Sequence, residues 1–294
     1  MKKLLAILLI LHPSSFILLS SCAKRETTKS PIVVGSKNFT ESVILGELVA
    51  HKLESAGCTA ERKLNMGGTF VCDSAIGSGA LDAYVEYSGT ALTAILKQPS
   101  SSDRAAVDRA VRAAYDKRQL TWGPHLGFNN TFAMIVRKDD AQRAGLAKIS
   151  DLRKVEAQSQ PGFGYEFVER PDGWNGLVAR YGLRFANAPK TMDLGLTYKA
   201  LASKQVDLIA GNSTDGLIDS LGLVALEDDL HYFPPYDAAV VSRVDIDRKC
   251  SGASHALAEF ANSIDDATMR RLNFEVDGKK RDVAEVVREF LAKR

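Results

Sequence analysis

The chain has 294 residues, of which 45% are hydrophobic, 25% charged and 7% aromatic. This composition is typical of a globular protein with one large or two medium domains, and it excludes a largely disordered chain. Lysine and arginine number 38 against 36 aspartate and glutamate, so the net charge of +2 does not favour nucleic-acid binding. Lys2 and Lys3 carry this excess, and the chain from Cys22 onward is neutral.

The N-terminus has the pattern of a secretory signal peptide. Apolar runs over residues 4–11 and 16–19 follow a basic start and are separated by His12 and Pro13. Each run is shorter than the roughly 20 residues that a membrane-spanning helix needs. We therefore expect residues 1–21 to be a signal that is removed on maturation. An uncleaved membrane anchor is the alternative, and the helix-breaking proline argues against it.

The next residues resemble a lipidation signal. Leu19-Ser20-Ser21-Cys22 resembles the lipobox of bacterial lipoproteins, in which the cysteine becomes the lipidated first residue of the mature chain. Acyl chains on Cys22 would insert into the bilayer, and the polar residues 22–30 would form a short tether. We predict a lipid-anchored protein in the periplasm or at the cell surface. A free thiol beside a cleaved signal is the weaker alternative.

Three further cysteines, Cys58, Cys72 and Cys250, follow the tether. An exported chain tolerates disulfides, but spacing does not determine which cysteines pair. We expect small buried side chains, with a Cys58–Cys72 bridge as the alternative. The three form no CxxC pair, so the sequence indicates no metal or redox site.

After the tether, strands and helices alternate. A strand over residues 31–35 precedes a helix with Asn38 as its cap and Glu41 three residues later, and Gly57 ends that helix. Further strands are predicted over 59–64, 81–86, 131–136 and 206–210. Further helices are predicted over 69–76, after Thr90, and over 103–119, 193–203, 215–221, 254–264 and 281–292. The alternation predicts an α/β fold with parallel sheets covered on both faces.

Common enzyme motifs are absent from the sequence. It contains no phosphate-binding loop, dinucleotide-binding, nucleophile-elbow or zinc-protease motif, and its histidines are scattered. We predict a protein that is not an enzyme and needs no cofactor or metal. An exported hydrolase is the alternative, and it would need a nucleophile and a base brought together by the fold.

Short motifs along the chain carry a family resemblance. They are residues 35–41 (GSKNFTE), 81–90 (LDAYVEYSGT), 128–133 (FNNTFA), 167–173 (FVERPDG), 206–216 (VDLIAGNSTDG) and 233–236 (FPPY). In this order they resemble the solute-binding proteins of ABC transporters for glycine betaine, choline and other osmoprotectants. The matches extend over nearly the whole chain after the tether.

The resemblance implies a two-lobed, periplasmic-binding-protein-like fold of type II, with the ligand in a cleft that closes by hinge motion. Lobe 1 would comprise residues 31–128 and 236–294, and lobe 2 residues 129–235. The prolines within residues 233–236 suit the second crossover, because they disfavour helix.

A betaine needs two kinds of binding group. Aromatic faces bind a quaternary ammonium, which has no hydrogen-bond donor, at about 0.5–2 kcal/mol per contact. A carboxylate needs cationic side chains or N–H donors. By resemblance, the positions of the aromatic cage are Tyr87, Phe132 and Tyr236. The positions that hold the ligand's carboxylate are Lys37, Thr90 and Arg170.

Each of these residues also has a structural role open to it. The rings would pack in the core, Lys37 and Arg170 would be solvated surface charges, and Thr90 would cap a helix. Aromatic candidates of second rank are Tyr84, Tyr165 and Tyr198.

Two positions depart from the family pattern. Asn130 stands where some members have aspartate, and Asn212 stands where an aromatic cage residue is often found. A thinner cage of three rings with one polar wall follows, and asparagine offers both a donor and an acceptor. We hypothesise a ligand with extra polar groups, such as ergothioneine, and expect glycine betaine to bind weakly.

The leading prediction is a lipid-anchored protein that delivers a zwitterionic or quaternary-ammonium solute to an ABC permease, with no nucleic-acid partner. Candidate ligands are glycine betaine, choline, carnitine, proline betaine and ergothioneine. The alternative is a receptor domain of the same fold, in which closure signals to a sensor.

Overall fold

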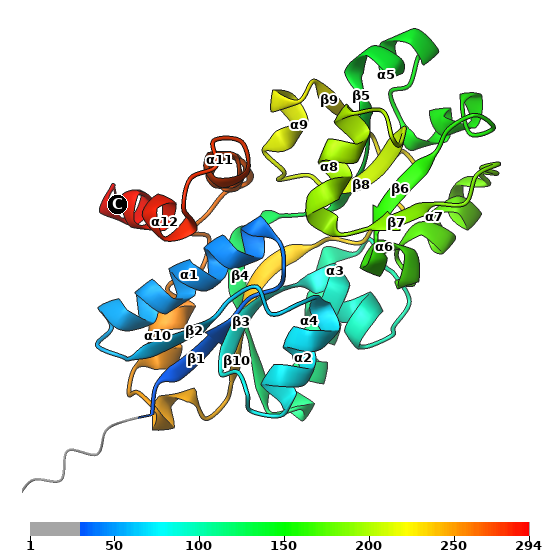
Figure 1. Cartoon of the computed structure of the whole chain (residues 1–294). Coiled ribbons are helices and arrows are strands. Elements are labelled where there is room, and N and C mark those ends of the chain that lie inside the picture. Colours follow the sequence, from blue (N-terminus) through cyan, green and yellow to red (C-terminus); the bar gives the residue numbers. More distant parts are fainter. Residues whose placement is uncertain (1–29, 294) are drawn as a thin grey trace, which may run out of the picture.

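The computed structural model describes residues 30–293 and divides them between two five-stranded sheets flanked by helices (Figure 1). We call the first sheet with its helices lobe 1 and the second sheet with its helices lobe 2. The predicted α/β class is confirmed. The predicted signal peptide, Cys22 and all but the last residue of the tether lie outside the described residues.

The sheet of lobe 1 is mixed. Its strands are β1 (Ile32–Gly35), β2 (Ala60–Lys63), β3 (Ala83–Tyr87), β4 (Leu120–Asn129) and β10 (Asp237–Arg243). They lie in the order β2-β1-β3-β10-β4. The strand β1 pairs in parallel with β2 and β3, whereas β10 runs antiparallel to β3 and β4.

The sheet of lobe 2 is mixed in the same way. Its strands are β5 (Phe132–Arg137), β6 (Pro161–Gly164), β7 (Lys190–Met192), β8 (Leu208–Asn212) and β9 (Leu223–Leu226). They lie in the order β7-β6-β8-β5-β9. The strand β6 pairs in parallel with β7 and β8, and β5 runs antiparallel to β8 and β9.

The prediction of parallel sheets is therefore wrong for β5 and β10. The chain passes from the first sheet to the second between β4 and β5, and it returns between β9 and β10. Each antiparallel strand is thus the first one after a crossover and enters its sheet from the other lobe. A buried apolar run has the same pattern in either direction, so the sequence did not indicate the direction of these strands. The exact lobe boundaries stay a prediction.

Helices cover both sheets. In lobe 1 they are α1 (Thr40–Ser55), α2 (Thr69–Gly77), α3 (Ser88–Thr90) with a π-helical turn (Ala91–Ile95), α4 (Arg104–Lys117), a 3-10 turn (Ile246–Arg248), α10 (Ala253–Ala258), α11 (Asp266–Asp277) and α12 (Val283–Ala292). In lobe 2 they are α5 (Lys138–Ala144), a 3-10 turn (Ile149–Lys154), α6 (Tyr165–Glu169), α7 (Trp174–Tyr181), α8 (Leu194–Ala202) and α9 (Leu217–Ser220). Within residues 30–293, no helix is both long enough and apolar enough to cross a bilayer.

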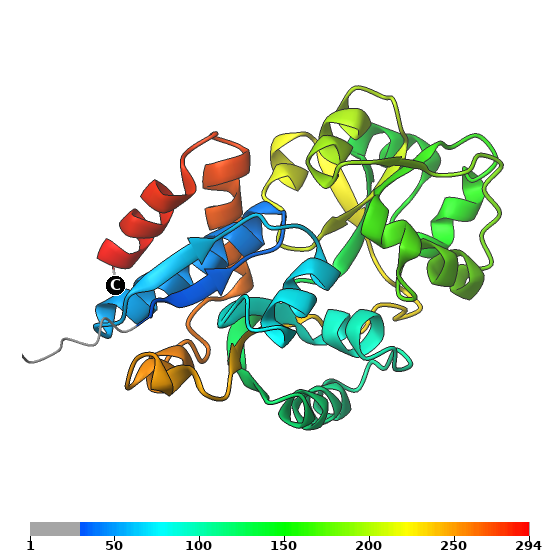
Figure 2. The same cartoon turned by 60° about the horizontal axis from the view of Figure 1, so that its bottom comes forward.

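The helix α1 is the core element of lobe 1. It packs against β1, β2 and β3 on one side and against α10, α11 and α12 on the other, as Figures 1 and 2 both show. Its side chains Ile44, Leu45, Leu48 and Leu53 are at most 1% exposed. Each such burial contributes about 1.5–3 kcal/mol. The returning C-terminal segment is therefore part of the core of lobe 1.

The start of α1 differs from its prediction. The helix begins at Thr40 after the extended residue Phe39, and no side chain caps it. The prediction that Asn38 caps this helix is therefore wrong. The polar side chains of the first turn have other partners: the Thr40 hydroxyl donates to Asp277 at 2.6 Å, and the Glu41 carboxylate accepts from Tyr87 and from other donors described below.

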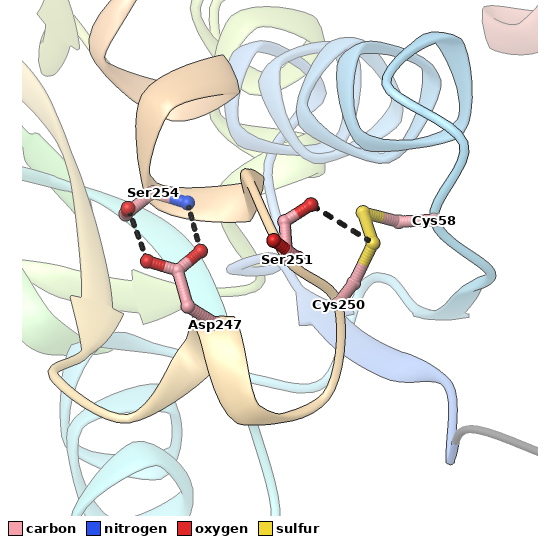
Figure 3. The surroundings of a disulfide bond; sticks show 5 residues. All are labelled: Cys58, Asp247, Cys250, Ser251 and Ser254. Atoms are coloured by element: carbon pink, nitrogen blue, oxygen red, sulfur yellow. Dashed lines mark hydrogen bonds between the residues drawn. A yellow bond between two sulfur atoms is a disulfide. The ribbon is translucent and has the colours of Figure 1, made fainter. Parts of the chain in front are cut away.

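A disulfide joins Cys58, just after α1, to Cys250, just before α10 (Figure 3). The suggested Cys58–Cys72 bridge is wrong. Cys72 belongs to the buried cluster that contains Tyr84, and Cys58 belongs to the cluster that contains Val85. Because Tyr84 and Val85 are neighbours in β3, they point to opposite faces of the lobe 1 sheet, and the two cysteines lie in the clusters on those opposite faces. Cys72 is a free, buried thiol.

The turn that carries Cys250 is itself fixed by hydrogen bonds. Asp247 accepts from the backbone N–H of Ser254 at 3.0 Å and from its hydroxyl at 2.5 Å (Figure 3). These bonds close the turn in front of α10 and position Cys250 opposite the end of α1. The disulfide thus connects the two chain segments that make up lobe 1.

Candidate ligand-binding site

A cavity of about 280 Å³ lies between the two lobes. It is bordered by residues that follow the carboxyl ends of β1, β3, β6 and β8, and by residues at the start of the antiparallel strands β5 and β10. Because β5 and β10 run in the opposite direction, their starts lie at the same sheet edges as the other strands' ends. This edge is where α/β proteins bind ligands.

The structure brings the residues of the predicted site together. Those that line the cavity are Lys37, Tyr87, Thr90, Asn130, Phe132, Arg170, Asn212 and Tyr236. Of the aromatic candidates of second rank, Tyr165 also lines it. Tyr84 is instead buried on the far face of the lobe 1 sheet. Tyr198 lines an adjoining cavity of about 370 Å³ and donates to Asp215 at 2.6 Å.

The aromatic lining is richer than the three rings predicted. Phe39 and Phe167 also line the cavity, and sequence reasoning missed both. The Phe132 ring centroid lies 4.9 Å from that of Phe167 and 5.5 Å from that of Tyr236, each edge to face. Phe39 and Phe167 belong to the motifs that carried the resemblance, so the signal for them was present.

On the lobe 1 side, the cation of the cavity is already paired. The Lys37 Nζ lies 2.5 Å from Glu86 Oε1, and both side chains are almost fully buried. The same Nζ lies 5.0 Å from the centre of the Tyr87 ring. Burial raises the pKa of Glu86 although the positive charge of Lys37 opposes the rise. This pair therefore contributes no net charge to the cavity.

The cation on the lobe 2 side is paired more extensively. Arg170 donates from Nε and Nη2 to the two oxygens of Asp172, at 2.9 and 2.6 Å. Its Nη2 also donates across the cleft to the Thr90 hydroxyl at 3.1 Å, and Tyr236 donates to Asp172 at 2.5 Å. Burial alone would raise the pKa of Asp172, but the bonds from Arg170 and Tyr236 bring it below its usual value.

One end of the Arg170 side chain stays available. Its Nη1 has no partner among the residues that the structure describes. Its Cζ lies 5.1 Å from the centre of the Phe132 ring. The alternative role of Lys37 and Arg170 as solvated surface charges is thus wrong, because both are buried at the cleft and each contacts a carboxylate.

The two asparagines of the polar wall are held by carboxylates. Asn130 donates from Nδ2 to Glu41 at 2.7 Å, and its Oδ1 has no partner within residues 30–293. Asn212 donates to Asp215 from its backbone N–H at 2.8 Å. Asn212 also pairs with Phe132 across β5 and β8, which places the amide beside a ring of the cavity.

Comparison with known proteins identifies this arrangement. Residues 30–293 match the family described as the substrate-binding domain of ABC-type glycine betaine transport systems. The chain belongs to this family. Its members bind small betaine-type solutes outside the cytoplasm for an ABC permease, so the family is one of transporter binding proteins and not of enzymes.

Relatives with different ligand names are equally similar to the chain. The carnitine transport binding protein OpuCC of Listeria monocytogenes is 33% identical over 99% of this chain and 97% of its own. The glycine-betaine-binding protein of Pseudomonas aeruginosa is 33% identical over 88% and 86%. The ergothioneine transport permease/binding protein EgtU of Helicobacter pylori is 33% identical over 94% of this chain and 50% of its own. Overall identity therefore does not select a ligand.

Solved structures confirm the two-lobed fold. The crystal structure of a glycine betaine/carnitine/choline ABC transporter aligns with a TM-score of 0.73 and 30% identity, over 89% of this chain and 98% of that one. Lactococcal OpuAC, solved in a closed form with glycine betaine, aligns with a TM-score of 0.61 over 90% and 96%. Its identity is only 13%, so that likeness supports the fold alone.

Proposed function

We propose that the inter-lobe cavity captures a betaine, a zwitterion with a quaternary ammonium and a carboxylate, by closure of the two lobes. The observation that carries the proposal is that aromatic rings line the cavity beside two cations whose charges are already neutralised. Such a cavity has no net positive charge to select a simple anion. It offers local donors and ring faces together, which is what a zwitterion requires.

Each end of the ligand has a binding group. The carboxylate would accept from the free Nη1 of Arg170, with the Thr90 hydroxyl and the remaining protons of Lys37 nearby. The quaternary ammonium would lie against the rings of Tyr87, Phe132 and Tyr236. Phe39 and Phe167 would extend this cage.

The polar wall favours a betaine that has hydrogen-bonding groups of its own. Asn130 and Asn212 line the cavity where a cage of rings alone would give only apolar contact. Carnitine and ergothioneine carry a hydrogen-bond donor in addition to the carboxylate, whereas glycine betaine has the carboxylate alone. We therefore expect the donor-bearing betaines to bind more tightly than glycine betaine.

Calorimetry with a ligand panel tests this function. The panel comprises glycine betaine, proline betaine, carnitine, ergothioneine and choline, the last of which lacks a carboxylate. We expect binding of at least one betaine, weaker binding of choline, and loss of binding in Tyr236→Ala. Lack of binding by every betaine, or full binding by Tyr236→Ala, would contradict the proposed site.

We also propose that Cys22 anchors the protein to a membrane by covalent lipid, which the lipobox-like segment supports. Mass spectrometry of the mature N-terminus tests it, with Cys22→Ala as the control that should be released in soluble form. A receptor role is the competing use of the same fold. Genes for a permease and an ATPase next to the gene of this protein would favour transport, and a neighbouring sensor gene would favour the receptor.

A further inference from the structure

One buried carboxylate connects the cavity wall to both lobes. Glu41, in the first turn of α1, is 2% exposed. Its Oε1 accepts from the Tyr87 hydroxyl at 2.8 Å and from Asn130 Nδ2 at 2.7 Å. Its Oε2 accepts from the Thr214 hydroxyl at 2.6 Å and from Asn273 Nδ2 at 3.0 Å. A carboxylate has about four acceptor positions, so these bonds use its full capacity.

The four donors come from different parts of the molecule. Tyr87 and Asn130 line the ligand cavity, at the ends of β3 and β4. Asn273 belongs to α11 of lobe 1, whereas Thr214 follows β8 in lobe 2 and is 1% exposed. The Asn273 amide also donates to the Thr214 carbonyl at 3.0 Å. Glu41 and Asn273 therefore hold one residue of the opposite lobe between them.

We propose that Glu41 is a positioning residue that couples the wall of the ligand cavity to the contact between the lobes. Through Oε1 it orients the Tyr87 ring and the Asn130 amide, and through Oε2 it holds Thr214 when the lobes meet. Separation of the lobes removes Thr214, so Oε2 keeps its bond from Asn273 and only the position vacated by the Thr214 hydroxyl is open to water. The coupling rests on the proposed function, because it predicts how tightly a bound solute is retained.

Asn130 gains its orientation from this contact. The Oε1 of Glu41 accepts from the Asn130 amide, so the Asn130 Nδ2 faces Glu41 and its Oδ1 faces away. That oxygen is the one without a partner among the described residues. Lobe contact and the presentation of the cavity wall thus depend on the same carboxylate.

The decisive variant is Thr214→Val, which keeps the shape of the side chain and removes its donor. Thr214→Ser is the matched control, since it restores the hydroxyl. A hydrogen bond to a charged group is expected to affect ligand release by about tenfold to a hundredfold. We expect stopped-flow release of glycine betaine and of ergothioneine to accelerate by that factor in Thr214→Val and to stay near the wild-type rate in Thr214→Ser.

A second measurement works without ligand. Spin labels on exposed positions of α4 and α8 report the distance between the lobes. We expect longer distances in Thr214→Val than in wild type and Thr214→Ser, with the same urea midpoint in all three. Glu41→Gln should show a larger effect, because its amide turns a donor toward two of the four donors.

The outcomes separate this proposal from the proposed function. If wild type binds none of the betaines of the panel, the proposed function is contradicted, and the spin-label distances still test Glu41. If Thr214→Val matches wild type in lobe distance, and in release of whichever solute binds, Glu41 does not couple the cavity to the lobes. Equal effects of Thr214→Val and Thr214→Ser would also overturn the proposal, since the hydroxyl would then be irrelevant.

Discussion

The two lobes share one sheet plan and differ in how each neutralises the cation it presents to the cleft. In both, an antiparallel strand from across the crossover lies fourth in a mixed sheet. Lobe 1 pairs Lys37 with Glu86, whose pKa is raised by burial. Lobe 2 pairs Arg170 with Asp172, whose pKa is lowered despite burial. The planar arginine fork, together with Tyr236, stabilises its partner better than the single ammonium contact does.

The lobes also differ in how the chain builds them. Lobe 1 consists of two segments far apart in sequence, and the Cys58–Cys250 disulfide ties them together. The strands of lobe 2 all lie within residues 132–226, a segment that contains no cysteine. The comparison teaches that the same strand order is accompanied by a disulfide in lobe 1 and by the well-satisfied Arg170–Asp172 ion pair in lobe 2.

We expect the largest effect from removal of the disulfide. This change tests whether the covalent bond, which lobe 1 has and lobe 2 lacks among the described residues, stabilises lobe 1 in particular. The bonded cysteines are 192 residues apart, and the loop-entropy model gives about 5 kcal/mol for a loop of that length. We expect Cys58→Ser with Cys250→Ser to lower the unfolding free energy of lobe 1 by up to that amount. Fluorescence reports the lobes separately, because Trp122 lies in lobe 1 and Trp174 in lobe 2.

Single-tryptophan variants make this test specific. Trp174→Phe leaves only the lobe 1 reporter, and Trp122→Phe leaves only the lobe 2 reporter. Equal shifts of both transitions in the disulfide variant would show that the lobes unfold as one unit. The disulfide would then stabilise both lobes alike and not lobe 1 in particular.

The next effect comes from breaking the ion pair of lobe 2. Asp172→Ala leaves the buried Arg170 without its carboxylate and the Tyr236 hydroxyl without its acceptor. We expect a loss of about 3–5 kcal/mol in unfolding free energy, measured by urea denaturation. Asp172→Asn keeps the shape and one acceptor, so its loss should be smaller. A loss below about 1 kcal/mol in Asp172→Ala would mean that water replaces the pair.

A somewhat smaller effect is expected from pH, through Glu41. Burial raises the pKa of Glu41 from 4.5 to about 7, against its hydrogen bonds from Thr214, Asn273 and Tyr87. Between these values the folded protein keeps a proton that the unfolded chain has released, so unfolding free energy falls as pH rises. The difference corresponds to about 3 kcal/mol.

Urea denaturation at pH 5 and pH 8 measures this dependence. Burial likewise raises the pKa of Asp215 in lobe 2 to about 6, so it contributes with the same sign. The difference between wild type and Glu41→Gln isolates the contribution of Glu41, and that between wild type and Asp215→Asn isolates the contribution of Asp215. A pH dependence unchanged by Glu41→Gln would contradict the assignment.

The smallest effect is expected from the ion pair of lobe 1. Glu86→Gln keeps an acceptor for Lys37 and for the Tyr87 N–H, and it removes a carboxylate whose ionised form burial disfavours. We expect a loss of about 1 kcal/mol in unfolding free energy. A loss as large as that of Asp172→Asn would show that the two pairs are equally well satisfied, and the electrostatic comparison would fail.

The sequence by itself determined the α/β class, the alternation of elements and the residues that meet at the cleft. The spacing of apolar residues indicates which side chains of a helix or strand are buried. The ordered motifs located Lys37, Tyr87, Phe132, Arg170 and Tyr236, all of which line one cavity. The same motifs contained Phe39 and Phe167, which were overlooked.

Only the tertiary structure decided strand direction, cysteine pairing and the partners of the buried charges. Glu41 and Thr214 are 173 residues apart, and Cys58 and Cys250 are 192 apart. Local patterns carry no information about contacts at such separations, because packing of the two sheets and their crossovers determines them. Asp172 lies only two residues from Arg170, yet its role became clear only when the fold buried both and brought Tyr236 to the same oxygen.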